Sequence, residues 1–460
     1  MVVLLLKYGI LHHSEMPKEG FMVKKHTLNK LFLLMTMIVL PHSGFAAAFQ
    51  LWEQDGASVG NYHAGRAAIA EDASTAYYNP AGLIRIPNQQ LVIGVVPITI
   101  DFLFDGTIAV EKIDDNEPKA TKAQGGTLNF VPDLHYAAPI LNNLVFGLSV
   151  AVPFGLQTNY GYQSIARYSA TKTLLKVIDI SPSLAVAFNQ HLSIGAGADI
   201  EYSEAQFNLV ATVFDPMFDS YAKNSLSGHG VGYHAGILYQ FTPQTRIGLA
   251  YQSKVRHNFT GTSKFTGPLA NFMDDSLPAE ISNDNLKTTA TLPATTSLSF
   301  FSSVHPSWDL MATVSHTQWG IFKNVVLQNV SGIDENVDIS DEITVNIPQH
   351  YHNTWNYAVG LNYHVDERWF IRTGAGYDET PSNNEDRNLQ LPDGDRVAVA
   401  LGAHFQATKT LGFDIGWTHF FTESVPLDIT QQVGGQVTTT KGTVTGNADV
   451  YGFQMKWDMV

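Results

Sequence analysis

From about residue 90 to its end, the chain alternates between two kinds of side chain with a period of two residues. In 356–365 the apolar positions are Tyr357, Val359, Leu361, Tyr363 and Val365. The positions between them are Asn356, Ala358, Gly360, Asn362 and His364. Because successive side chains of a β-strand point to opposite faces, this period predicts strands with one apolar face and one small or polar face. The segments that repeat the pattern include 192–201, 232–241, 396–405 and 451–459.

The composition of the two faces indicates their surroundings. The apolar faces carry aromatic residues at their ends, as the outward faces of membrane barrels do at both interfaces. The opposite faces mix Gly, Ala and Ser with scattered polar groups, whereas a face in water would carry more Lys and Glu. Charged residues make up only 15% of the chain, below the roughly 25% of soluble domains. The mean hydropathy of −0.04 excludes a bundle of transmembrane helices, so the pattern favours a barrel that is apolar outside.

The connections between the strands alternate in length. We identify about fourteen strand candidates, an even number as in bacterial outer-membrane barrels. Short links such as Asn142-Asn143 and Thr408-Lys409 alternate with long ones such as 203–229 and 320–350. Short periplasmic turns and long outer loops are typical of these barrels. We therefore predict an all-β fold, a transmembrane antiparallel β-barrel over residues 90–460.

The N-terminus has the pattern of an export signal. Lys24, Lys25 and Lys30 precede the apolar run 31–40, and small residues follow at 46–48. A basic region, a short apolar run and a small-residue cleavage site define a secretory signal peptide. We expect residues 1–46 to be this signal, with translation starting at Met22, residues 1–21 untranslated and cleavage after Ala46.

Charge and cysteine content exclude several classes of function. The formal net charge is −15, and an acidic chain without a basic block is a poor partner for nucleic acid. With no cysteine, the chain has no disulfides, thiolate metal sites or Cys nucleophiles. The common motifs of hydrolases, zinc proteases and phosphate-binding loops are absent from the sequence. We therefore expect no enzyme activity, no catalytic residue, no cofactor and no metal.

Residues 47–89 do not alternate. They contain small residues at close spacing, and Asn79 before Pro80 fits a helix cap with Pro in the first turn. A segment of this length cannot form a core alone. We expect it to fold as a small helical plug, or hatch, inside the barrel lumen.

Several motifs resemble one known family. They are 49–54 (FQLWEQ), 65–74 (GRAAIAEDAS), 79–83 (NPAGL), 152–156 (VPFGL), 235–239 (AGILY) and 389–396 (LQLPDGDR). The chain is similar over its mature length to the FadL family of outer-membrane long-chain fatty acid transporters, with TodX-type aromatic hydrocarbon transporters as relatives. The resemblance implies a fourteen-stranded barrel with a hatch, whose motif residues here are Gly65, Arg66, Asp72, Asn79, Pro80 and Ala81.

The resemblance also implies a route for the ligand. A groove between outer loops would capture it, a deeper site near the mature N-terminus at Phe49 would bind it, and a kink in the third strand would open the wall. Pro153, Phe154 and Gly155 stand at the position of the kink. Proline has no backbone N–H to donate to a neighbouring strand, and glycine weakens a strand interior. The sequence is therefore consistent with an interruption of the wall pairing and also with a simple strand end.

Two further sets of residues are candidates for ligand contact, and each has a structural alternative. An apolar cluster with helix-like spacing could form the capture groove or a self-packed loop core; it contains Leu209, Val213, Phe214, Met217 and Phe218. A carboxylate ligand should meet a basic group. Arg372, Arg396 and Lys323 could supply it or could instead form salt bridges that hold the hatch.

The function expected from these patterns is passive uptake of long-chain fatty acids or similar hydrophobic molecules across the bacterial outer membrane. An aromatic hydrocarbon channel of the same family is the alternative, and an outer-membrane lipase or a surface adhesin ranks below both. The expected partners are the hydrophobic ligand, outer-membrane lipid and the barrel assembly machinery. We expect a monomer.

Overall fold

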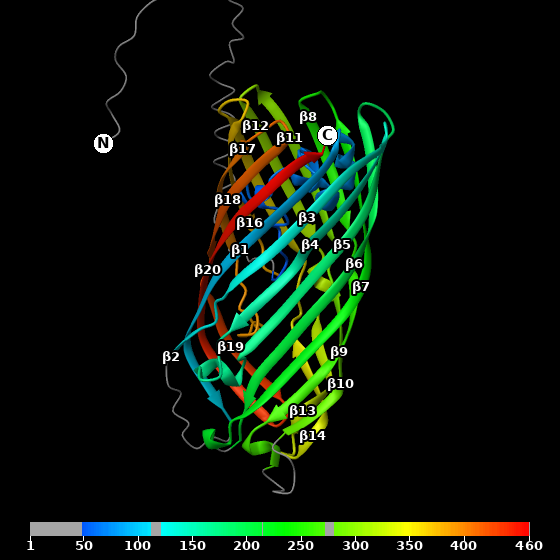
Figure 1. Ribbon diagram of the computed structural model, residues 1–460. Helices are drawn as coiled ribbons and strands as arrows, with labels where there is room; N and C mark the ends of the chain where they lie inside the picture. The colour runs from blue at the N-terminus through cyan, green and yellow to red at the C-terminus, as the bar shows by residue number, and fades with distance from the viewer. Residues whose placement is uncertain (1–47, 112–120, 214, 272–279, 460) are drawn as a thin grey trace, which may run out of the picture. The chain divides into compact units, whose positions relative to one another are not determined.

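The alternating segments form antiparallel strands that close into a barrel (Figure 1). The computed structural model describes residues 48–111, 121–213, 215–271 and 280–459. The expected signal peptide, residues 1–46, lies outside the described residues.

The strands of the first half are β1 (Gln89–Val110), β2 (Thr121–Gln124), β3 (Leu128–Leu141), β4 (Leu144–Asn159), β5 (Lys172–Ala187), β6 (Leu192–Ala211), β7 (Ser220–Gln240), β8 (Thr245–Gln252) and β9 (Val255–Thr266). Those of the second half are β10 (Glu280–Leu292), β11 (Thr295–His305), β12 (Trp308–Thr317), β13 (Asn324–Ile333), β14 (Ile339–Pro348), β15 (Thr354–His364), β16 (Trp369–Asp378), β17 (Arg396–Gln406), β18 (Leu411–Thr422), β19 (Val425–Val433) and β20 (Gln436–Met459).

These segments make fourteen passes of the wall, which confirms the prediction. Five passes are interrupted and consist of two segments each: β8–β9, β10–β11, β12–β13, β14–β15 and β18–β19. The short β2 adds a local pairing to β1. One interruption falls at Pro293, which cannot donate a ladder hydrogen bond.

The first and last strands close the barrel. β1 pairs with β20 from Gln89↔Met459 to Val110↔Thr438, and Figure 1 shows the blue and red strands side by side. Closure leaves no strand edge in the hydrocarbon, where an unpaired backbone group would cost several kcal/mol.

The two faces of the wall have the expected composition. In β17, Val399 and Leu401 are 37% and 54% exposed, whereas Ala398 and Ala400 are buried. Exposed tryptophans at the ends with short turns include Trp308, Trp369 and Trp457. The outward face is therefore apolar with an aromatic border, as a lipid-facing wall requires.

The long outer loops are shorter than the sequence predicts. The predicted loop 203–229 is mostly strand, because β6 continues to Ala211 and β7 begins at Ser220. The same correction applies to 320–350, which contains β13 and β14. The apolar alternation ends where the wall leaves the hydrocarbon, but backbone hydrogen bonds extend the strands further. The predicted loop bounds were wrong because they were placed where the apolar alternation ends.

The hatch consists of very short helices packed on the inner wall. These are α2 (Gly56–Val59), α3 (Arg66–Ile69), α4 (Thr75–Tyr78) and the 3₁₀ turn η1 (Pro80–Arg85). Asn79 caps η1 by accepting a hydrogen bond from Ala81 N, with Pro80 in the first turn, which confirms the predicted cap. No helix in the described part of the chain is long and apolar enough to cross a membrane.

Close approach of the hatch explains why the inner face is built of small residues. A Cβ placed at Gly248 would lie 1.8 Å from the backbone oxygen of Ala67, and one at Gly236 would lie 1.9 Å from Oδ1 of Asn79. Both distances are far inside van der Waals contact. Gly236 in β7 and Gly248 in β8 therefore let the hatch lie directly on the wall, at the Asn79 side chain and at the Ala67 backbone.

Candidate ligand cavity and opening in the wall

The wall separates between β3 and β4. Their pairing runs from Leu141↔Leu144 to Leu134↔Val150 and stops there. Beyond it, β3 stays paired with β1 as far as Leu128↔Thr99. β4 stays paired with β5, with a register shift between Ala151 and Phe154.

The separation is bounded at its outer end. Asn159 N donates to Gly125 O at 3.0 Å, so the chain on either side comes together again. We call the interval between Val150 and Asn159, where β4 is not paired with β3, the window. Pro153, Phe154 and Gly155 lie within it.

The N-terminal part of the hatch, ahead of its first helix, occupies the inner side of the window. Leu51 N donates to Pro153 O and Gly155 N donates to Phe49 O, both at 2.9 Å. Gln50 and Phe154 form an isolated antiparallel bridge. Residues 49–51 therefore pair with β4 where β3 has left it.

The side chain of Gln54 forms hydrogen bonds with the β4 backbone next to this bridge. It donates to Val152 O and accepts from Val152 N, both at 2.9 Å. A buried backbone group without a partner is costly, so these contacts stabilise a strand that has lost its neighbour. Hydrogen bonds from the N-terminal part of the hatch thus replace those of β3 along the window.

Phe49 anchors the segment in an aromatic cluster. Its ring centroid lies 4.7 Å from that of Trp319, 5.6 Å from Phe322 and 6.0 Å from Phe154. Sequence reasoning singled out Phe49 and Phe154 but missed Trp319 and Phe322. Trp319 begins the short 3₁₀ turn η5 (Trp319–Ile321) and Phe322 directly follows it, so neither belongs to a periodic pattern that would have indicated an inward position.

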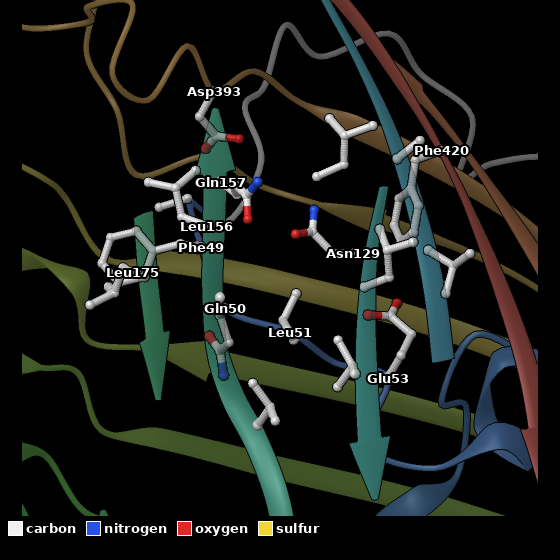
Figure 2. A pocket seen from close by; sticks show the side chains of 18 of the residues that line it. Phe49, Gln50, Leu51, Glu53, Asn129, Leu156, Gln157, Leu175, Asp393 and Phe420 are labelled. Carbon is white, nitrogen blue, oxygen red and sulfur yellow. The ribbon is translucent and has the colours of Figure 1, made fainter. Parts of the chain in front are cut away.

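A cavity of about 300 Å³ lies beside this segment (Figure 2). Apolar groups make up much of its lining: Leu51, Ile98, Ile100, Val152, Leu156, Leu175, Phe420 and Val450. Phe130 of β3 also lines it and is 63% exposed. Since Gly155 and Leu156 of β4 line it too, the cavity extends from the N-terminal segment to the window.

Charged side chains also line the cavity: Glu53, Asp393, Arg396 and Lys176. Arg396 Nη2 lies 2.8 Å from Asp378 Oδ2. Asp378 also accepts hydrogen bonds from Trp52 Nε1 at 3.2 Å and from Asn356 Nδ2 at 2.9 Å. The charge of Arg396 is therefore already offset by a fully buried carboxylate.

The pKa values of the Glu53 and Asp393 carboxyl groups are raised. Burial raises the pKa of Glu53 to about 7, and the charge of Arg396 counteracts part of that rise. Burial likewise raises the pKa of Asp393 to about 7. Oε1 of Glu53 is buried and has no hydrogen-bond partner among the described residues.

The other two basic candidates lie elsewhere. Arg372 is 1% exposed and forms ion pairs of 2.7 Å with Glu71 of the hatch and with Asp414. Lys323 Nζ donates to Tyr351 O at 3.1 Å. Neither residue lines the cavity, and Arg372 instead ties the hatch to the wall.

The hatch motif residues anchor the hatch. Arg66 pairs with Asp55 at 2.9 Å and with Glu71 at 3.1 Å, and Asp72 accepts from Gln454 Nε2 at 3.0 Å. Gly65 has a φ of 77°, in the left-handed region that glycine favours.

The Asn79-Pro80-Ala81 motif holds the hatch in the same way. Asn79 Nδ2 donates to Ala67 O at 2.6 Å and to Ile237 O of the wall at 3.1 Å. None of the six hatch motif residues lines the cavity.

The predicted capture cluster is only partly brought together. Leu209 lies in β6, so the helix-like spacing was misleading; the helical part is the single turn η3 (Pro216–Phe218). Leu209 and Val213 are buried against residues that include Phe265 and Leu269, with Phe218 packed on them. Met217 is 71% exposed, and Phe214 lies outside the described residues.

Leu209 also lines a second, smaller cavity of about 40 Å³. The other residues around it come from the outer parts of several strands, including Phe207, Phe265, Val330, Ile333 and Val345. It shares no lining residue with the larger cavity. Within the described ranges, no group of three or more His, Asp or Glu side chains is arranged to hold a metal ion.

Comparison with known proteins shows what this architecture belongs to. Residues 37–459 match the family model described as outer membrane protein transport protein (OMPP1/FadL/TodX). The chain belongs to this family. It is 27% identical to outer membrane protein P1 of Haemophilus influenzae, over 93% of this chain and 99% of that protein. It is 25% identical to the long-chain fatty acid transport protein of Salmonella typhi, over 88% and 95%.

Solved structures of the family share the fold. A Pseudomonas aeruginosa FadL homologue superposes with a TM-score of 0.77 at 24% identity, covering 90% of this chain and 100% of that one. The Pseudomonas putida toluene transporter TodX superposes with a TM-score of 0.63 at 15% identity, covering 89% and 99%.

Family membership confirms the expected class and location. The protein is an outer-membrane transporter of hydrophobic compounds, and its barrel lies in the bacterial outer membrane. The family consists of transport proteins.

Proposed function

We propose that the protein carries out passive uptake of long-chain fatty acids or similar long hydrophobic molecules. The ligand binds in the cavity beside Phe49 and leaves sideways through the window into the membrane. The observation that carries this proposal is the continuity of an apolar cavity with a bounded gap between β3 and β4. Relatives at 25–27% identity that include a long-chain fatty acid transport protein support the acyl class.

The lateral route follows from the chemistry of such a ligand. An acyl chain partitions poorly into water, so a path along the aqueous axis of the lumen is unfavourable. The hatch also obstructs that axis, because the ion pair of Arg66 with Asp55 ties the hatch to itself and the ion pair of Arg372 with Glu71 ties it to the wall. A path from an apolar cavity through the wall avoids both difficulties.

The outer cluster gives an entry point in this scheme. Leu209, Val213, Met217 and Phe218 lie near the outer ends of β6 and β7, and Met217 exposes an apolar side chain to the outside. We assign them the first contact with the ligand. Residues 47–89 act as the hatch and 90–460 as the barrel, which works as a monomer after insertion by the barrel assembly machinery.

Aromatic hydrocarbon uptake is the second candidate. It is favoured by the charges that act on Arg396, because this arginine interacts electrostatically with three carboxyl groups, those of Glu53, Asp378 and Asp393. A neutral hydrocarbon needs no cationic partner. The two candidates differ in the ligand and share the cavity and the window.

Uptake by cells tests both candidates. We expect the intact protein to restore oleate uptake in cells lacking their own fatty acid transporter. We expect deletion of residues 47–89 to abolish saturable oleate uptake, since it removes Phe49 and the cavity lining, and to admit large antibiotics through the opened lumen. Surface protease mapping checks assembly of both forms. Failure of the intact protein to import oleate, together with increased toluene sensitivity, would replace the first candidate by the second.

A further inference from the structure

Three carboxyl groups act on the one guanidinium of Arg396. The nearest is that of Asp378, which lies 2.8 Å from it. Glu53 from the N-terminal part of the hatch and Asp393 from the loop after β16 interact electrostatically with the same guanidinium. A ligand carboxylate would therefore join three carboxyl groups around one arginine.

Among the described residues, the other groups around Glu53 are mostly uncharged, and the one further cation in the cavity lining is Lys176. Tyr62 of the hatch lies close enough to interact electrostatically with it. The polar side chains that line the cavity from β3, β4, β18 and β20 are the uncharged Asn129, Gln157, Thr422 and Asn447. Lys176 of β5 lines the cavity as well, but its side chain is exposed.

Glu53 is the carboxyl group of the three that is available to a ligand. Asp378 is held by Trp52, Asn356 and Arg396, and Asp393 is held by Thr380 Oγ1. Glu53, in contrast, lines the cavity, and its Oε1 is buried without a hydrogen-bond partner among the described residues. Figure 2 shows Glu53 and Asp393 among the side chains that surround the cavity.

We propose that Glu53 determines head-group specificity: the cavity binds an uncharged polar head group, such as an alcohol or a protonated acid, and binds an anionic one only together with a proton on Glu53. The proposal rests on the proposed function and specifies the ligand that the cavity accepts. Protonated Glu53 can donate a hydrogen bond from the carboxyl group to the ligand head, whereas ionised Glu53 repels an anion in a low-dielectric site.

The direction of the pH dependence follows from the acidity of Glu53. Its pKa is raised to about 7, so the group is mostly neutral at pH 6 and mostly ionised at pH 8. An anion that requires the neutral form should lose affinity about tenfold per pH unit above 7, and about 100-fold in all between pH 6 and pH 9. An uncharged ligand should show no comparable loss.

The test uses the full mature protein in nanodiscs of zwitterionic lipid, with empty nanodiscs subtracted. Calorimetry measures binding of dodecane-1-sulfonate, whose charge does not titrate in this range, and of dodecan-1-ol between pH 6 and pH 9. We expect the steep loss for the sulfonate alone. In buffers of different ionisation enthalpy near pH 8, sulfonate binding should take up about one proton.

Two variants test whether Glu53 causes the pH dependence of sulfonate binding. Glu53→Gln should bind the sulfonate with the low-pH affinity at every pH and without proton uptake. Asp395→Asn is the matched control: burial also raises the pKa of Asp395 to about 7, but that carboxyl accepts from Tyr377 and does not line the cavity. It should keep the full pH dependence. Heat-modified migration in gels verifies that both variants are folded.

The outcomes separate the two proposals. Sulfonate binding that is independent of pH in the natural protein, or that keeps its pH dependence in Glu53→Gln, overturns the role of Glu53 while leaving hydrophobic uptake in place. Absence of binding by both the alcohol and the sulfonate instead overturns the proposed cavity itself.

Discussion

Replacement of Gly155 by tryptophan should nearly abolish oleate uptake while leaving the barrel assembled. A Cβ at this position would lie 3.0 Å from Cδ1 of Leu51, so any side chain there points toward the segment at the window. An indole would displace Leu51 and fill part of the cavity at its opening. We expect uptake to fall at least about tenfold, which corresponds to ~1.4 kcal/mol of lost binding or added barrier.

A tryptophan elsewhere on the same strand provides the control. Leu148 lies in β4 on the face opposite to that of the buried Gly147 and Ser149, so Leu148→Trp places the same indole toward lipid. This variant should import oleate normally. Initial rates are compared at equal surface amounts of protein. Normal uptake by Gly155→Trp would remove the support for exit through the window.

Replacement of Arg372 by leucine should destabilise the hatch strongly. The guanidinium is fully buried between Glu71 and Asp414, with both ion pairs at 2.7 Å. Leucine would leave two carboxylates in a low-dielectric interior without this partner. Breaking a buried ion pair by removing one side costs about 3–5 kcal/mol, and the cost here falls on the contact between the hatch and β16–β18.

Urea unfolding and protease digestion measure this effect. The unfolding midpoint should fall, and hatch sites should become accessible to protease before the strands do. Arg368→Leu is the control, because Arg368 is an exposed residue in the turn before β16, where surface substitutions change stability by about 0.5 kcal/mol or less. Equal stability of the two variants would show that the Arg372 pairs do not hold the hatch.

The architecture of the wall could be predicted because it depends on local pattern. The outward position of Val399 and Leu401, the closure of an even number of strands and the cap at Asn79 all follow from periodicity or residue type. Strand length could not be predicted in the same way. Parts of the outer ends of β6 and β7 carry polar residues on both faces, so they lack the apolar alternation. They are strands because their backbones pair with each other.

The site was less predictable. The Pro153-Phe154-Gly155 sequence left an interruption and a strand end equally open, and only the register of β3 against β4 shows a window that closes again at Asn159. The helix-like spacing of the outer cluster wrongly indicated a helix, because Leu209 belongs to a strand. Of the three cations considered for a carboxylate ligand, Arg396 alone lines the cavity.

The sequence by itself determined an exported, lipid-facing barrel of the FadL type, because one face of every strand must be apolar and the other must admit a hatch. The tertiary structure decided where a ligand can bind. Glu53 is distant in sequence from Asp393 and Arg396, and it joins them in the cavity lining because the N-terminal part of the hatch packs against β4. Such a meeting depends on long-range packing and strand register, which no local pattern of residues encodes.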